Sequence, residues 1–345
     1  MLRIDNQSSD CSVYGFVRDD GMIGVIRVGT SGADHIDGTP FDDTLSGLGG
    51  HDTLHGGEGA DALDGGLGLD TASYAGAIAR VVLDLRSGGR GGDADGDVFW
   101  SIENVIGSDH NDYIFGNSAN NVLSGGDGDD HLRGHNGDDT IFGGNGADDL
   151  VGGNGNDQLF GGADNDTLHG GRGVDVLDGG QGVDTVSYAG ARGRVIFDLR
   201  SQGWDGDAED DTYISIENAI GTDHNDLIFG SNADNILVGG AGNDMLRGHN
   251  GNDTIIGGAG ADDLNGGAGA DVFVFSVGHG NDELNDFQDD IDVIQFSEFP
   301  FSDPADGMSY AEQVGRNVVF DFGNGDILTV ENATMSQLLN DVEIL

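Results

Sequence analysis

The sequence contains no lysine, only one cysteine and no long apolar run. A single cysteine, Cys11, excludes an intrachain disulfide. No segment approaches the roughly 20 consecutive apolar residues that a membrane-spanning helix needs. All 13 basic residues are arginines, against 63 Asp and Glu, and the formal net charge is −50. Such an acidic surface repels phosphates and argues against nucleic acid as a partner.

The first residues, 1–6, also lack the apolar core of a cleaved signal peptide, which taken alone predicts a cytosolic protein. What the sequence has in abundance is glycine, with 65 residues, and aspartate. High charge with few aromatic residues is typical of disorder, of a halophile surface or of carboxylates that serve as metal ligands. Composition does not choose among these three; the order of the residues does.

The order of the residues has a period of nine. Residues 125–187 divide into seven consecutive nonapeptides of the form GGxGxDxUx, where U is a large aliphatic residue, and further copies lie on either side. The sixth-position aspartates of the good copies are Asp52, Asp61, Asp70, Asp130, Asp139, Asp148, Asp157, Asp166, Asp175, Asp184, Asp244, Asp253, Asp262 and Asp271. Weaker copies are centred on Asp34, Asp43, Asp112, Asn121, Asp226 and Asn235.

A longer period lies above the first, because residues 65–153 reappear at 179–267, shifted by 114 without a gap. We therefore expect a duplicated unit in which blocks of repeats alternate with spacers. The predicted segments are a β lead-in at 1–28, repeat blocks at 29–75, 108–189 and 222–275, spacers at 76–107 and 190–221, and a C-terminal cap with a secretion signal at 276–345.

Each part of the repeat has a physical role. Glycines permit positive φ and tight turns, so that backbone carbonyls and a short carboxylate can converge. Calcium takes about 6 to 8 oxygen ligands of these kinds at about 2.3–2.6 Å. The eighth residue is expected to point inward, and stacked repeats then form a solenoid core. These interior residues are Leu132, Ile141, Leu150, Leu159, Leu168 and Leu177.

The motif resembles the RTX (repeats-in-toxin, hemolysin-type) calcium-binding nonapeptide family. The resemblance implies an all-β fold, a parallel β-roll in which two repeats make one turn and several Ca²⁺ ions lie between successive turns. Residues 282–294 are similar to the segment that ends the rolls of serralysin-type proteases and mannuronan epimerase modules. The resemblance to the RTX family also implies secretion from a Gram-negative bacterium by a type I exporter, directed by an uncleaved C-terminal signal. The lack of an N-terminal signal peptide is then expected.

The spacers and the cap carry weaker signals. Residues 80–85 and 194–199 are predicted strands, and the acidic loops after them are interpreted as turns. Phe99, Trp100 and Trp204 are expected to fill the interior, with stacking on a sugar as the alternative. Residues 323–325 predict a hairpin turn, and residues 334–337 predict a capping box before a short helix.

No catalytic centre is expected. The sequence has neither HExxH, the zinc motif of the RTX proteases, nor GxSxG, the nucleophile motif of the RTX lipases. His110 and His224 are equivalent copies in the duplication, which favours a scaffold over a single active site. We expect a non-enzymatic calcium-binding protein outside the cell; the alternative is an accessory module, like those of alginate epimerases, that binds an acidic polysaccharide or a cell-surface component.

Metal binding and folding should be one event, because the stacked carboxylates repel one another without calcium. In excess EGTA we expect circular dichroism to show a largely unfolded chain, and in millimolar calcium a gain of β-structure. A β-signal that is the same in both conditions would contradict this expectation.

Overall fold

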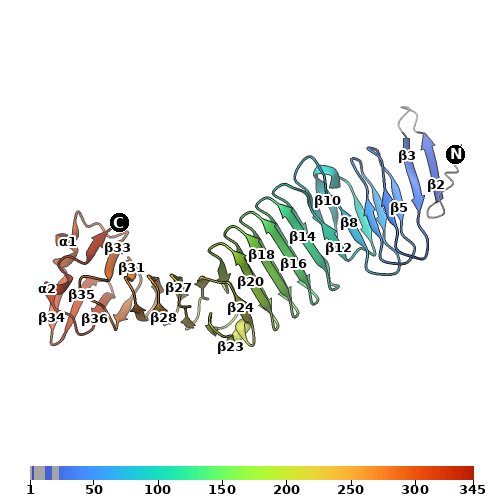
Figure 1. The fold of residues 1–345 in the computed structure, drawn as a ribbon. Coiled ribbons are helices and arrows are strands. Elements are labelled where there is room, and N and C mark those ends of the chain that lie inside the picture. The colour runs from blue at the N-terminus through green and yellow to red at the C-terminus, as the bar shows by residue number, and fades with distance from the viewer. Residues whose placement is uncertain (1, 4–11, 18–22) are drawn as a thin grey trace. The chain divides into compact units, whose positions relative to one another are not determined.

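The computed structural model describes residues 2–3, 12–17 and 23–345 (Figure 1). Cys11 and parts of the predicted lead-in lie outside the described residues. The chain divides into two compact units, residues 1–182 and 183–345. The seven segments predicted above follow the periodicity of the sequence rather than compactness, and their boundaries stay a prediction.

Three sheets form the first unit. In order across the sheet, the first contains β1 (Leu2–Arg3), β2 (Ser12–Val17), β3 (Ile23–Val28), β5 (Thr44–Ser46), β7 (Ala62–Asp64) and β11 (Val98–Trp100). The second contains β4 (His35–Asp37), β6 (Thr53–His55), β8 (Thr71–Ser73), β12 (Asn104–Ile106), β14 (Val122–Asp127), β16 (Thr140–Asn145), β18 (Gln158–Ala163) and β20 (Val176–Gln181). The third contains β10 (Gly88–Gly91), β9 (Val82–Asp84), β13 (Tyr113–Phe115), β15 (His131–Asn136), β17 (Asp149–Asn154) and β19 (Thr167–Arg172).

Successive strands of the repeats alternate between two sheets, and within each sheet they run parallel. Leu132 of β15 pairs with Leu150 of β17, and Ile141 of β16 pairs with Leu159 of β18. Each partner lies 18 residues further along the chain, so two nonapeptides make one turn. Figure 1 shows the resulting stack of β14, β16, β18 and β20. The predicted parallel β-roll is confirmed.

The core is the ladder of eighth-position residues. All six interior residues named from the sequence are fully buried, and the equivalent residue of every other copy is at most 2% exposed. A fully buried Leu or Ile stabilises a fold by about 1.5–3 kcal/mol, and one repeat supplies only one of them. The roll is therefore stable only as a stack.

The glycines do more than turn the chain. In the central repeats the strand continues through the first three residues of the following repeat, so Gly126 pairs with Gly144. Gly144 has a φ of 127°, and a Cβ there would lie 1.9 Å from the carbonyl oxygen of Gly126. Only glycine permits both this backbone and this approach. The reversal of the chain then falls on residues 146–148.

The spacer of the first unit joins the roll through strands. The strand predicted at residues 80–85 is β9, which continues the third sheet and is followed by the antiparallel β10 and a 3₁₀ turn at Gly92–Ala94. The interpretation of the two tryptophans as interior residues is wrong, because Trp100 is 53% exposed and Trp204, in the equivalent spacer of the second unit, is 47% exposed. Other residues fill the interior of the spacers, such as Leu83 and Ala94 in the first and Phe197 and Ala208 in the second.

The second unit repeats this architecture in two sheets. The first contains β21 (Thr185–Ser187), β25 (Asn218–Ile220), β27 (Ile236–Ala241), β29 (Thr254–Ala259), β31 (Val272–Ser276), β33 (Val293–Ser297) and β37 (Val342–Ile344). The second contains β23 (Gly203–Asp205), β22 (Ile196–Asp198), β26 (Leu227–Phe229), β28 (Met245–Asn250), β30 (Asp263–Ala268), β32 (Asn281–Leu284), β36 (Asp326–Val330), β35 (Asn317–Gly323) and β34 (Ala311–Val314). A further strand, β24 (Thr212–Ile214), follows a 3₁₀ turn at Gly206–Ala208.

The C-terminal segment caps this unit. The antiparallel pair β35–β36 is the hairpin expected at residues 323–325. Two short helices, α1 (Pro304–Met308) and α2 (Met335–Leu338), lie beside it (Figure 1). Gln337 accepts a hydrogen bond from the Thr334 N–H at 2.9 Å, as the predicted capping box requires. Among the described residues, no helix has the length and apolar character needed to cross a membrane.

The buried eighth-position residues allow a prediction of how much folding stability a cavity in the first unit costs. Leu150→Ala should lower the free energy of unfolding by about 2–5 kcal/mol, measured by urea unfolding in saturating calcium. The exposed Val174 provides the control, because Val174→Ala should change that free energy by about 0.5 kcal/mol or less. Equal effects of the two substitutions would contradict a core built on the eighth position.

Candidate metal centres

The fourteen predicted aspartates occupy equivalent places, each at the end of a chain reversal and two residues before an interior side chain. All fourteen are at most 3% exposed. Burying a carboxylate is costly unless its charge is compensated, so the partners of each oxygen atom decide what the site can do.

One carboxylate oxygen takes part in a ladder that runs along the roll. Asp148 Oδ1 accepts the Asp130 N–H at 2.8 Å, and the Asp148 N–H in turn donates to Asp166 Oδ1 at 2.9 Å. In the second unit Asp244 and Asp262 make the same bond at 2.8 Å. The step is 18 residues, as the resemblance implied, so aspartates one turn apart share a side of the roll.

The other carboxylate oxygen, Oδ2, lies outside this ladder of hydrogen bonds. Within the described part of the chain, Oδ2 is buried without a hydrogen-bond partner in eleven of the fourteen, namely Asp52, Asp61, Asp70, Asp130, Asp139, Asp148, Asp157, Asp244, Asp253, Asp262 and Asp271. The remaining three, Asp166, Asp175 and Asp184, are equally buried. Because buried polar atoms in native structures nearly always have a partner, a row of orphaned carboxylate oxygens indicates a ligand.

In several repeats a backbone carbonyl oxygen lies on the same side of the first glycine as the orphaned carboxylate oxygen. A Cβ at Gly143, the first residue of its repeat, would lie 2.1 Å from Asp148 Oδ2 and 2.6 Å from the carbonyl oxygen of Gly161, one turn further along. At Gly239 the corresponding distances, to Asp244 Oδ2 and the Gly257 carbonyl oxygen, are both 2.4 Å. Carboxylate and carbonyl oxygens therefore converge at the first glycine, and this hard oxygen set fits calcium.

The electrostatics are unfavourable for these carboxylates on their own. Desolvation by burial, with repulsion from neighbouring aspartates, raises the pKa of Asp61 and Asp148 to about 8. The same causes raise the pKa of Asp130 and Asp244 to about 7. A divalent cation between such groups supplies the missing compensation and holds them in the charged form.

The weaker copies differ from the fourteen. Asp112 Oδ2 accepts the N–H of Ser108 at 2.6 Å, and Asp226 Oδ2 accepts the N–H of Thr222 at 2.6 Å. The acidic loop of the first spacer is also internally partnered, since Asp97 Oδ2 accepts the Tyr74 hydroxyl at 2.7 Å. Sequence reasoning missed the role of the residue four positions before the aspartate, although the change from glycine to Ser or Thr is visible in the sequence.

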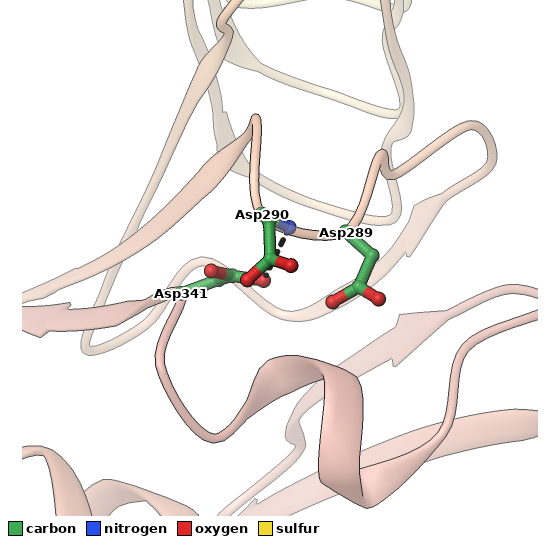
Figure 2. A group of neighbouring side chains, drawn as sticks. All are labelled: Asp289, Asp290 and Asp341. Atoms are coloured by element: carbon green, nitrogen blue, oxygen red, sulfur yellow. Dashed lines mark hydrogen bonds between the residues drawn. The ribbon is translucent and has the colours of Figure 1, made fainter.

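Another acidic group lies in the C-terminal cap. Figure 2 shows the carboxylates of Asp289, Asp290 and Asp341 turned toward one another, close enough to share a cation. Asp289 and Asp290 are exposed, however, and Asp341 Oδ2 already accepts the Asp290 N–H at 3.2 Å. This group therefore lacks the orphaned buried oxygen that sets the repeat aspartates apart.

The comparisons with known proteins agree with this geometry. The family model described as RTX calcium-binding nonapeptide repeat matches residues 28–63, 37–72, 106–141, 115–150, 124–159, 151–186, 220–255, 241–273 and 248–284. No curated protein matches the sequence.

Two solved structures are similar in part. The extracellular lipase LipA from Serratia marcescens is 20% identical, with a TM-score of 0.28, and the match covers 68% of this chain and 40% of the lipase chain. The AlgE6R3 subunit of the Azotobacter vinelandii mannuronan C5-epimerase is 25% identical, with a TM-score of 0.28. That match covers 34% of this chain and 77% of the subunit. The chain thus spans less than half of the lipase.

The family match covers more than half of the sequence and includes all fourteen predicted aspartates. The repeats bind Ca²⁺, and the regular rows of buried carboxylates fit several ions. The chain belongs to the family of RTX calcium-binding nonapeptide repeat proteins.

Proposed function

We propose that this chain is a secreted, non-enzymatic calcium-binding protein whose fourteen repeat aspartates supply the metal ligands. The observation that carries the proposal is the row of buried Oδ2 atoms, which the described part of the chain leaves without a partner in eleven of the fourteen. Each repeat supplies a carboxylate, and in repeats such as those of Asp148 and Asp244 a glycine carbonyl one turn away adds a second oxygen. Oxygen-only sites of this kind favour calcium over transition metals, which prefer nitrogen and sulfur ligands.

Folding on calcium binding follows from the same charges. Successive aspartates on one side of the roll are one turn apart, and the ladder between their N–H groups and Oδ1 atoms fixes them there. Without metal this arrangement buries like charges in a chain whose net charge is −50. Calcium affinity is then part of the folding free energy, so the chain folds where calcium is abundant.

The space outside the cell, where calcium is abundant, suits this chemistry. The RTX family to which the chain belongs is typically exported by type I systems, and low cytosolic calcium would keep the chain unfolded until it leaves the cell. In the folded protein the terminal strand β37 pairs with β33. Because this pairing makes the segment part of the folded sheet, an exporter that recognises residues 276–345 would have to bind them before calcium folds the chain.

A second candidate function is binding of an acidic polysaccharide, and the exposed spacer tryptophans favour it. Trp100, with Phe99 and Arg86, lines a cavity of about 200 Å³ in the first unit. An aromatic face beside an arginine suits a carboxylated sugar, because the ring can stack on the sugar and the guanidinium can pair with the carboxylate. Arg86 is paired with Asp84 at 2.9 Å, so a sugar carboxylate would compete with that aspartate.

Removing one ligand should remove bound metal. Asp148→Asn keeps an oxygen for the ladder but places an amide where Oδ2 lies, so we expect at least one fewer calcium ion per chain and a lower midpoint of thermal unfolding in calcium. Atomic emission after gel filtration gives the ion count. Asp109→Asn, which removes the same charge from an exposed residue, should leave both values unchanged. An ion count that does not fall in Asp148→Asn would reject the proposed ligand set.

Sugar binding can be tested with alginate, a polymer of carboxylated sugars. If the spacer is the binding surface, the full chain in calcium should be retained on alginate beads, and Trp100→Ala should weaken retention several-fold. Phe142→Ala, which removes an exposed aromatic side chain from a repeat, should have no effect. No retention of the unmodified chain would remove this candidate function.

A further inference from the structure

The six weaker repeats share a contact that the structure shows only for them among the repeats. Their second residues are Thr30, Thr39, Ser108, Asn117, Thr222 and Ser231. In all six, the N–H of this residue donates to a side-chain oxygen of the sixth residue at 2.5–2.8 Å. We call these repeats closed turns, and we call the fourteen repeats whose second residue has a positive φ open turns.

Hydroxyl groups add further donors in four of the closed turns. Ser108 Oγ donates to Asp112 Oδ1 at 2.9 Å, and the N–H of Val81 donates to the same oxygen at 2.6 Å. With the Ser108 N–H on Oδ2, the Asp112 carboxylate accepts three protein hydrogen bonds. Three donors of this kind stabilise a buried carboxylate without a metal.

Open turns have a different backbone at the second residue. Its φ lies between 73° and 127° in all fourteen, whereas no second residue of a closed turn has a positive φ in residues 23–345. Eleven of the fourteen are glycines, but the others are Leu48, His135 and His249. Residues other than glycine rarely adopt this left-handed backbone conformation, which costs roughly 1–2 kcal/mol of conformational free energy per residue. In these three open turns the fold therefore imposes this backbone on a residue that has a side chain.

Two closed turns dispense with the carboxylate altogether. Asn121 and Asn235 stand in the sixth position, and their Nδ2 groups donate to the carbonyl oxygens of Glu103 at 2.8 Å and Glu217 at 2.6 Å. The amide nitrogen thus takes the place of the ladder oxygen Oδ1, and the amide oxygen accepts the N–H of the second residue. An amide carries no charge, so a turn of this kind offers no negative charge to compensate a cation.

The closed turns occur in consecutive pairs, centred on residues 34 and 43, 112 and 121, and 226 and 235. Because two repeats make one turn of the roll, each pair is one complete coil at the start of a repeat block. Each closed coil also supports the open turns after it, since the N–H groups of Asp112 and Asn121 donate to Asp130 and Asp139, both at 2.7 Å.

We propose that protein donors take the place of calcium in the six closed turns, so that each repeat block begins with one calcium-independent coil. The proposal rests on the ligand role proposed above for the fourteen aspartates. The second residue of the repeat determines the outcome: Ser, Thr or Asn closes the turn, and a left-handed residue leaves Oδ2 open to the ion. Through its N–H groups, the closed coil then holds the carboxylates of the next coil, the first open turns of the block, in the position that calcium binding requires.

The test compares neighbouring carboxylates of one ladder in the full chain. Asp130→Asn and Asp244→Asn, in open turns, should each lower the calcium count by at least one ion. Asp112→Asn and Asp226→Asn, in closed turns, should leave it unchanged. Circular dichroism in calcium establishes that each variant is folded.

A gain of metal tests the same idea in the opposite direction and does not depend on the loss variants folding. The triple change Ser108→Gly, Asn117→Gly and Asn121→Asp opens one closed coil and should add at least one calcium ion. Ser87→Gly, at an exposed spacer residue, is the control and should add none.

The outcomes separate this inference from the proposed function. If Asp112→Asn and Asp226→Asn lower the calcium count as much as Asp130→Asn and Asp244→Asn, the closed turns bind calcium and the inference is wrong, while the proposed function stands. An opened coil that folds without taking up an ion would also overturn it. If Asp130→Asn and Asp244→Asn leave the count unchanged, the proposed ligand set itself is wrong.

Discussion

The hydrogen bond from an aspartate N–H to the carboxylate one turn later is the interaction on which the rest of this structure depends. It fixes the 18-residue step, because Asp148 Oδ1 can reach the Asp130 N–H only if two nonapeptides form one turn. The same step aligns Leu132 with Leu150 in the core. It also commits one oxygen of carboxylates such as Asp148 and Asp262 to the backbone, so that only the second oxygen is available to another partner.

That second oxygen links the fold to its metal. In a core of one Leu or Ile per repeat, burying a row of carboxylates opposes folding, as the raised pKa of Asp61 and Asp148 reflects. Two solutions occur along the same ladder. In closed turns such as that of Asp112, N–H and hydroxyl donors surround the carboxylate, and for the open turns we propose that calcium takes this role. The choice is made by a single backbone dihedral, at the second residue of the repeat.

The duplication shows which features belong to the architecture. Asp97 and its equivalent Asp211 accept hydrogen bonds from Tyr74 and Tyr188, so both spacers fold around a partnered acid. The tryptophans, by contrast, are not equivalent: Trp100 corresponds to Ile214, and Trp204 to Arg90. The internal contacts repeat with the sequence, whereas the exposed surface of each spacer is its own.

Much of this protein could be predicted from the sequence, because a nine-residue period repeats one physical environment many times. The period predicted a solenoid with a buried eighth residue and picked out the fourteen aspartates, which are all buried, while the resemblance to the RTX family implied the parallel β-roll. The sequence did not decide the exposure of Trp100, which depends on how much interior the spacer strands leave. Nor did it reveal that Leu48, His135 and His249 adopt the glycine backbone. The change at the second residue of the weaker repeats is visible in the nonapeptide, but only the tertiary structure showed what it does, because the hydrogen bond from that residue to the sixth side chain forms only with the φ that the folded turn adopts.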